Sequence, residues 1–214
     1  MNVAVLASGG GTNLQALLDA QAQGRLAPAR VTVVGVNVAG CGALARAEAA
    51  GVPTFVLPHG AFPDRGAFDT ALLEKLRDFD VSCVVLAGFM RLLTPAFLDA
   101  FPDGVLNVHP ALLPAFPGLH AQKQAFEAGV KFAGCTVHFV DAGVDSGPIV
   151  AQAVVPVLPD DTAETLQQRI LRQEHALLPA VVRAHAEGRV RREGRRVQID
   201  DAPRAASDAA LSSL

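Results

Sequence analysis

The first 86 residues alternate short apolar runs with longer segments of helical periodicity, and this alternation restricts the fold more than any other feature of the chain. Strands are expected at residues 3–7, 31–38, 54–57 and 81–86, with helices starting at Asn13, Ala43 and Gly66. Strands that alternate with helices form βαβ units and a parallel sheet. The first and fourth strands are apolar nearly throughout, which is typical of strands covered by helices on both faces.

A Pro-rich stretch at residues 105–118 separates this half from a second one. Further strands are expected at residues 135–140 and 149–157, before a long helix at 162–187. We predict an α/β fold: a Rossmann-like open, mostly parallel twisted sheet with helices on both faces, in a single domain. Residues 191–214 are expected to form a C-terminal hairpin and a disordered tail, because the last segment has few large apolar side chains.

Composition excludes several classes of protein. The 214 residues are 50% hydrophobic with a formal net charge of -3, enough for one domain with a sizeable core. No apolar run reaches the ~20 residues of a membrane span, and the N-terminus lacks the basic start of an export signal, so we expect a cytoplasmic protein without membrane contact. The mild acidity disfavours nucleic acid as a partner, and the basic cluster 189–196 is interpreted as a solvated hairpin. The three cysteines are interpreted as buried apolar residues.

A glycine-rich turn follows the first expected strand. Three successive glycines, ending at Gly11, precede Thr12, Asn13 and a helix. Glycines let a ligand approach the backbone closely, and the free N–H groups of a helix start attract an anion, so a phosphate is the favoured ligand. The dinucleotide fingerprint would need Gly where Leu14 stands, which favours a sugar phosphate or a mononucleotide. The alternative is a tight strand-to-helix turn without a ligand.

Polar residues follow the strand expected near residue 105. Asn107 and His109 are two residues apart, so they share one face of a strand, where an amide donor lies beside an imidazole. Asn suits an oxygen that gains negative charge, and His can exchange a proton near neutral pH. Asp145, in the later loop, would favour the imidazolium form of His109 if it lay nearby. The trio suits acyl-type transfer, although a strand-end His is often structural.

Two other histidines are less informative. His138 alternates with apolar residues in its strand and is interpreted as a core residue, whereas His120 is equally consistent with a supporting role and with a surface loop. The chain has neither a Ser nucleophile elbow nor an HExxH or paired His/Cys spacing, so covalent and metal mechanisms are disfavoured and no metal is expected.

At these residues the sequence resembles the folate-dependent phosphoribosylglycinamide formyltransferases. The segments that carry the resemblance are Val-Leu-Ala-Ser-Gly-Gly-Gly-Thr-Asn-Leu-Gln-Ala (5–16), Val-Leu-Ala-Gly-Phe-Met-Arg-Leu-Leu (85–93), Leu-Asn-Val-His-Pro-Ala-Leu-Leu-Pro-Ala-Phe-Pro-Gly (106–118), Gly-Cys-Thr-Val-His-Phe-Val-Asp (134–141), Asp-Ser-Gly-Pro-Ile (145–149) and Gln-Glu-His (173–175). The resemblance implies a formyltransferase domain at 1–190, with a phosphate-binding half at about 1–100 and a folate and catalytic half at about 101–190.

The resemblance also implies a reaction and its ligands. The formyl group of 10-formyltetrahydrofolate, a co-substrate, would pass to the amine of phosphoribosylglycinamide in de novo purine biosynthesis, without a metal and with small molecules as partners. Asn107, His109 and Asp145 would be catalytic. The phosphoribosyl substrate would contact Gly11, Thr12, Asn13, Gln173 and Glu174. The folate would contact Arg65, Met90, Arg91, Leu92, Leu93, Asn107, Val140, Asp141, Ala142, Gly143, Val144 and Asp145, with Leu86, Phe89 and Leu106 also candidates for its apolar slot. A monomer or weak homodimer is expected.

The sequence departs from the family pattern at several positions. Val38 stands where the family usually has Lys, Gly143 where an acidic residue is common, and Leu171 where the residue is often polar. Two related enzymes are alternatives, a formyltetrahydrofolate deformylase and a methionyl-tRNA formyltransferase, but each would carry a further domain that is not expected here. A non-catalytic folate- or nucleotide-binding module is the alternative from another class.

Overall fold

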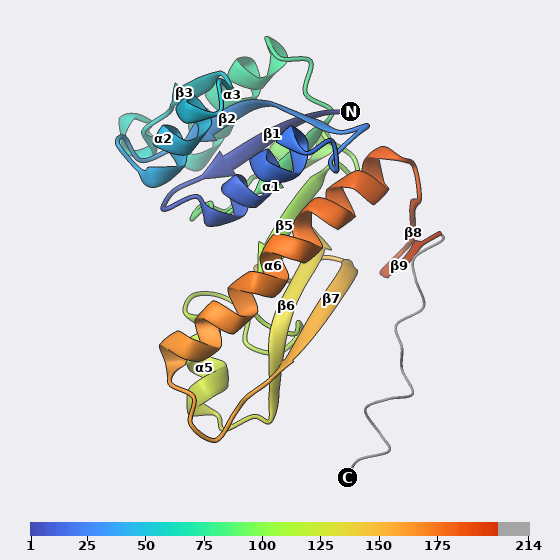
Figure 1. The fold of residues 1–214 in the computed structure, drawn as a ribbon. Helices are drawn as coiled ribbons and strands as arrows, with labels where there is room; N and C mark the ends of the chain where they lie inside the picture. Colours follow the sequence, from blue (N-terminus) through green and yellow to red (C-terminus); the bar gives the residue numbers. More distant parts are fainter. Residues whose placement is uncertain (201–214) are drawn as a thin grey trace.

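A computed structural model describes residues 1–200, and the predicted tail at 201–214 lies outside the described residues. The described chain forms a seven-stranded sheet in the order β3-β2-β1-β4-β5-β6-β7 and a separate two-stranded hairpin (Figure 1). The strands are β1 (Asn2–Ala7), β2 (Arg30–Val36), β3 (Thr54–Val56), β4 (Cys83–Leu86), β5 (Val105–His109), β6 (Phe132–Phe139), β7 (Ile149–Pro156), β8 (Val190–Glu193) and β9 (Arg196–Ile199).

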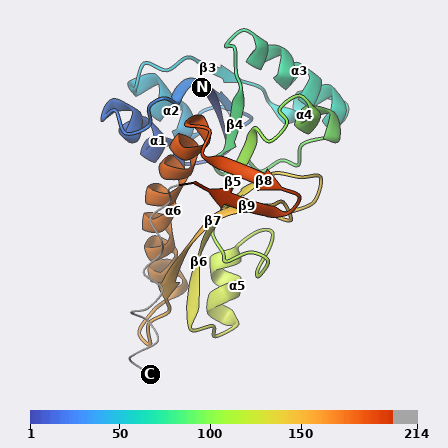
Figure 2. The ribbon, with the colours of Figure 1, turned by 90° about the vertical axis from the view of Figure 1, so that its right-hand side faces the viewer.

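Helices cover both faces of the sheet, as predicted. The helices are α1 (Thr12–Ala22), α2 (Gly42–Ala49), α3 (Arg65–Arg77), α4 (Pro95–Asp99), α5 (Ala121–Glu127) and α6 (Ala163–Ala186). Figure 2 shows α1, α2 and α6 on one side of the sheet and α3 and α4 on the other. Along β1 the buried side chains alternate between two apolar clusters: Val3 and Val5 pack with α1 and α6, and Ala4 and Leu6 pack with α3.

The sheet is parallel from β3 to β5 and antiparallel from β5 to β7. The mostly parallel α/β sheet predicted from the sequence is therefore confirmed, with strand ends that differ by up to three residues. Helices α4 and α5 and a short 3₁₀ turn at His59–Ala61 were not predicted. Within residues 1–200, no helix is long and apolar enough to cross a membrane.

Helix α6 joins the two halves of the chain. It contacts α1 in the first half and β6 and β7 in the second (Figure 1). Its start is fixed by a capping box in which Thr162 and Thr165 exchange side-chain to backbone hydrogen bonds of 3.3 and 2.9 Å. Its buried stripe, which faces the sheet and α1, includes Leu166, Ile170, Leu178 and Val182.

The buried stripe of α6 makes a direct stability prediction. Leu178→Ala removes a side chain that is 0% exposed and should lower the free energy of unfolding by about 2–5 kcal/mol, because the cavity collapses only partly. Gln168→Ala, at an exposed position on the same helix, is the matched control. Urea unfolding followed by circular dichroism measures both; an equal, small effect of the two variants would contradict the packing of α6 against the sheet.

Candidate active site

A cleft of about 810 Å³ opens at the carboxyl ends of the parallel strands. The strand order reverses between β1 and β4, and ligands of open α/β sheets bind at such a switch point. The volume lies in the range of small-molecule sites. The cleft is lined by Asn13, Leu86, residues 88–93, residues 107–110, residues 118–120, Gln122, His138, residues 140–145, Gln167, Leu171 and Glu174.

Three polar residues predicted from the sequence converge in this cleft. His109 Nδ1 lies 3.2 Å from Asp145 Oδ2. Asn107 Nδ2 donates to Asp145 Oδ1 at 3.4 Å. His109 is buried and Asp145 is largely enclosed, so the contacts lie in surroundings where water screens charges weakly. The structure therefore brings together an amide, an imidazole and a carboxylate at one point of the cleft wall.

The pairing of β5 with β6 adds a histidine to this group. Asn107 lies opposite His138 in the antiparallel register, and its Nδ2 lies 3.1 Å from His138 Nε2. His138 Nδ1 lies 2.8 Å from the Phe139 carbonyl, which needs a proton on Nδ1 and leaves Nε2 of the neutral ring as an acceptor. His138 is thus buried, as expected of a core residue, and it also contacts the polar group; its sequence alternation indicated only the first property.

The Pro-rich segment contributes backbone groups that the sequence did not indicate. The Phe116 carbonyl lies 2.8 Å from His109 Nε2, and the Gly118 amide donates to Asp145 Oδ2 at 2.8 Å. Both ring nitrogens of His109 therefore face acceptors, an arrangement that suits a ring carrying two protons. The sequence indicated this stretch as a separator of the two halves. In the structure it also contacts His109 and Asp145 of the trio.

Asp145 is held as a carboxylate by these neighbours. Burial opposes its ionisation, but the pKa of the Asp145 carboxyl is lowered below its usual range by the His138 side chain, whose Nε2 lies 3.7 Å from Asp145 Oδ1, by the hydrogen bond from the Gly118 amide, and by the charges that His109 and His138 carry when protonated. An ionised Asp145 is the form that can favour a positive charge on His109. The arrangement can therefore supply hydrogen-bond donors and a proton acceptor to a reacting group nearby.

Most of the residues assigned to the folate line the cleft. Met90, Arg91, Leu92, Leu93 and the 140–145 loop all do, together with Leu86 and Phe89. Arg91 lies 5.8 Å from the centre of the Phe68 ring, and its Nε is buried without a hydrogen-bond partner among the described residues. Apolar lining residues beside an unpartnered polar group fit a heteroaromatic ring with polar edges.

Two of the assigned apolar and basic residues lie elsewhere. Leu106 is fully buried in the apolar cluster beneath α1 and α6, because it faces away from the cleft on β5. Arg65 is exposed at the start of α3 and is not part of the cleft lining. The structure thus does not bring either residue to the cleft wall.

The glycine-rich turn leads into α1, whose Asn13 lines the cleft, whereas Gly11 and Thr12 do not. Gly11 has a positive φ of 73°, and a Cβ there would lie 2.6 Å from Ala43 Cα, so packing alone requires this glycine. A Cβ at Gly9 or Gly10 would have nothing within 4 Å, so packing explains neither of them. Packing therefore accounts for Gly11 and leaves Gly9 and Gly10 without a structural explanation.

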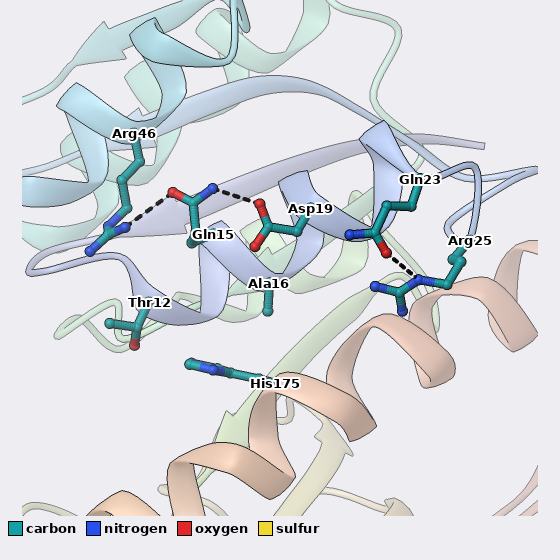
Figure 3. Close-up of a pocket in the computed structure, with 8 residues that line it drawn as sticks. All are labelled: Thr12, Gln15, Ala16, Asp19, Gln23, Arg25, Arg46 and His175. Carbon is teal, nitrogen blue, oxygen red and sulfur yellow. Dashed lines mark hydrogen bonds between the residues drawn. The ribbon is translucent and has the colours of Figure 1, made fainter.

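Arg46 contacts the backbone of the turn, and the first residues of α1 line two different pockets. Arg46 donates from Nε to the Gly10 carbonyl at 2.8 Å and from Nη1 to Gln15 at 3.1 Å. Thr12 lines a second pocket of about 320 Å³ between α1 and α6, which also holds His175 (Figure 3). Asn13 lines the main cleft instead, so adjacent residues of α1 face different pockets.

Glu174 faces Asn13 across the cleft end. Asn13 Nδ2 donates to Glu174 Oε2 at 2.6 Å, while Asn13 Oδ1 is buried without a partner among the described residues. Burial raises the pKa of Glu174, and the Asn13 hydrogen bond only partly offsets this effect. Gln173 is half-buried and outside the cleft lining, so of the two assigned α6 residues the structure brings only Glu174 to the cleft.

Comparisons with known proteins identify the family of this chain. The sequence model of the family described as formyl transferase matches residues 1–182. The chain belongs to the formyl transferase family. Within residues 1–200, no three His, Cys, Asp or Glu side chains are grouped to hold a metal ion.

Relatives inside the family carry more specific names. The chain is 49% identical over 193 residues to the trifunctional purine biosynthetic protein adenosine-3 of Drosophila pseudoobscura pseudoobscura, covering 89% of this chain but only 14% of that protein. It is 49% identical to a phosphoribosylglycinamide formyltransferase of Mycobacterium tuberculosis, covering 91% of this chain and 92% of that one. The structure of glycinamide ribonucleotide transformylase 1 from Symbiobacterium toebii matches with a TM-score of 0.91 and 55% identity, covering 93% of each chain.

The contact between Asn13 and Glu174 leads to a prediction about stability. Glu174→Gln keeps the acceptor for Asn13 Nδ2, adds a donor for the unpartnered Asn13 Oδ1 and removes a buried charge. We expect the variant to gain about 1 kcal/mol in unfolding free energy at neutral pH, which corresponds to about 2–4 °C in Tm.

The pH dependence of that gain follows from the raised pKa. A raised carboxyl pKa makes ionisation destabilising once the pH exceeds the ordinary value of 4.5, and the effect is complete above the folded-state pKa. The gain should therefore be present at neutral pH and disappear below about pH 4, where the wild-type carboxyl is protonated in both states. Thermal unfolding of both proteins across this range checks it; a constant difference would contradict the charge effect.

Proposed function

We propose that the chain transfers the formyl group of 10-formyltetrahydrofolate to the amine of phosphoribosylglycinamide, as a step of de novo purine biosynthesis. The observation that carries this proposal is the convergence of Asn107, His109 and Asp145 in a cleft that is also lined by Asn13, at the start of α1. The names of the relatives, which include a phosphoribosylglycinamide formyltransferase covered over nearly its whole length, support the same reaction.

The two ends of the cleft suit the two substrates. Gly11, Thr12 and Asn13 would hold the phosphate through backbone N–H groups and the side-chain amide of Asn13, and the carboxylate of Glu174 would accept hydrogen bonds from the ribose hydroxyls. The folate would lie along residues 88–93 and the 140–145 loop, with its ring against the apolar wall and its polar edge towards backbone groups. The amine and the formyl carbon would then meet beside the catalytic trio.

In this mechanism the protein stabilises charge and moves one proton. The amine attacks the formyl carbon, and the oxygen that becomes negative accepts hydrogen bonds from Asn107 and from the imidazolium of His109. Asp145 favours the positive charge on His109 and accepts the amine proton, directly or through a water molecule. When the tetrahedral intermediate collapses, the bond between the formyl carbon and N10 of the folate breaks, and the proton passes to N10, which leaves as tetrahydrofolate. No covalent enzyme intermediate or metal ion is needed.

Substrate binding has to replace the contact between His109 and Phe116 before His109 can donate to the substrate through Nε2. His109 Nε2 lies 2.8 Å from the Phe116 carbonyl, so its proton already has an acceptor. A formyl oxygen that uses this donor would replace the Phe116 carbonyl. Phe116 has a positive φ of 54°, an unfavourable backbone conformation for this residue type, at the point where the segment would have to move.

One assay separates the proposal from its alternatives. The protein is mixed with 10-formyltetrahydrofolate, with and without phosphoribosylglycinamide, and tetrahydrofolate release is followed. Release that requires the ribonucleotide supports the transferase; release without it indicates a deformylase, and no release in either mixture favours the non-catalytic binding module. The expectation of a monomer or weak homodimer stays a prediction that sedimentation can test.

The catalytic roles predict large losses of turnover. His109→Ala and Asp145→Asn should each lower kcat by about 10²-fold or more, which is the usual size of a general acid–base contribution. Circular dichroism should show that both variants keep the fold. Asp160→Asn, at an exposed position, is the control and should keep the wild-type rate. A near wild-type rate in either trio variant would remove that residue from the mechanism.

The assignment of the phosphate end predicts selective weakening of one substrate. Asn13→Ala removes a donor at the start of α1 and should raise KM for phosphoribosylglycinamide about tenfold, a typical effect of one hydrogen bond to a charged group. KM for the folate should change little, because its contacts lie along residues 88–93. Gln23→Ala, exposed at the far end of the same helix and outside the main cleft, is the control. Equal weakening of both substrates would contradict the assignment.

A further inference from the structure

The C-terminal hairpin β8–β9 is attached to the domain that carries the cleft. Val190, Val197 and Ile199 pack against the apolar cluster of the main sheet, and β9 contacts β7. Arg192 forms an ion pair with Asp103, close to the start of β5. The hairpin therefore has a fixed position beside the strands that carry the catalytic trio.

The turn of the hairpin contacts the loop that carries Asp145. Arg195, in the turn between β8 and β9, donates from Nη2 to the Ser146 carbonyl at 2.8 Å. Figure 2 shows the two strands of the hairpin lying across the sheet near β7, with their turn beside the connection between β6 and β7. A guanidinium donor gives a stronger hydrogen bond than a neutral one.

The loop is otherwise supported mainly from within and from the cleft side. Ser146 Oγ donates to Asp141 Oδ1 at 2.6 Å, and the Gly143 amide donates to the same oxygen at 3.1 Å. Asp145 has a positive φ of 49°, a conformation that persists only where the surroundings hold it. The Gly118 amide donates to the Asp145 carboxylate, and Arg195 donates to the carbonyl of the following residue, Ser146.

We propose that Arg195 is a positioning residue, which holds the 141–146 loop so that the Asp145 carboxylate stays within reach of His109. This inference rests on the proposed function for its catalytic consequence, but the contact itself exists independently of the reaction. Arg195 touches no reacting atom and acts through the Ser146 carbonyl. The basic cluster interpreted from the sequence as a solvated hairpin thus contains one arginine with a specific structural partner at the site.

The test compares Arg195→Ala with Arg196→Ala in the full chain. Arg196 is exposed on the same hairpin and has no ion pair or side-chain hydrogen bond within residues 1–200, so its variant removes the same charge without the contact. Arg195→Ala should lower kcat and raise KM for 10-formyltetrahydrofolate, each about three- to tenfold, and leave KM for phosphoribosylglycinamide unchanged. Arg195→Lys, which keeps one charged donor, should recover part of the loss.

Hydrogen exchange supplies a readout that does not depend on catalysis. The amides of residues 142–146 should exchange at least threefold faster in Arg195→Ala than in the wild type and in Arg196→Ala. Wild-type exchange and kinetics in Arg195→Ala, or equal effects of the two Ala variants, would overturn the proposal. Faster exchange of the hairpin amides in Arg195→Ala would mean that this variant loosens the hairpin as well as the loop. In that case Arg195→Lys decides, and the proposal is overturned if Arg195→Lys does not restore slow exchange of the loop amides. Absence of formyl transfer by the wild type would refute the proposed function, while the exchange comparison would still decide the positioning role.

Discussion

The antiparallel register between β5 and β6 is the constraint on which the site depends. It sets Asn107 opposite His138 and His109 opposite Thr136, so the polar groups of two strands meet at one end of the sheet. Thr136 donates to the Ala111 carbonyl at 2.7 Å and accepts from the Leu113 amide at 3.1 Å, which holds the chain leaving β5 against β6. A slip of one residue would turn these side chains to the opposite face and separate the trio.

The parts of this arrangement that depend on local spacing could be predicted from the sequence. Alternation of strands and helices predicts the parallel sheet, and the two-residue spacing of Asn107 and His109 predicts their shared face. The position of Asp145 has no such local signal. It is separated from His109 by the whole of β6, so its place depends on which strands pair and in which register. Only the resemblance to a known family indicated that the three residues belong together.

The remaining features of the site could not be predicted from the sequence. They depend on backbone groups, which every residue has, or on which face of a strand or turn a side chain occupies. The Phe116 carbonyl and the Gly118 amide contact the trio, but backbone groups leave no trace in residue type. Leu106 is as apolar as the residues that line the cleft, yet it lies on the other face of β5. Arg195 was indistinguishable in the sequence from its neighbour Arg196, because a hairpin turn decides which arginine reaches the loop.

Unfavourable backbone and charge environments gather around the cleft rather than spread over the fold. Within residues 1–200, five non-glycine residues have positive φ, and three of them, Phe116, His120 and Asp145, border the cleft or contact the trio. Each such residue costs about 1–3 kcal/mol, and the buried Glu174 adds the cost of a desolvated carboxylate. A fold stabilised only by its core would have no reason to keep these features together. Their location is expected if the cleft must hold donors and acceptors ready for a ligand, because substrate groups can then replace protein partners that are already strained.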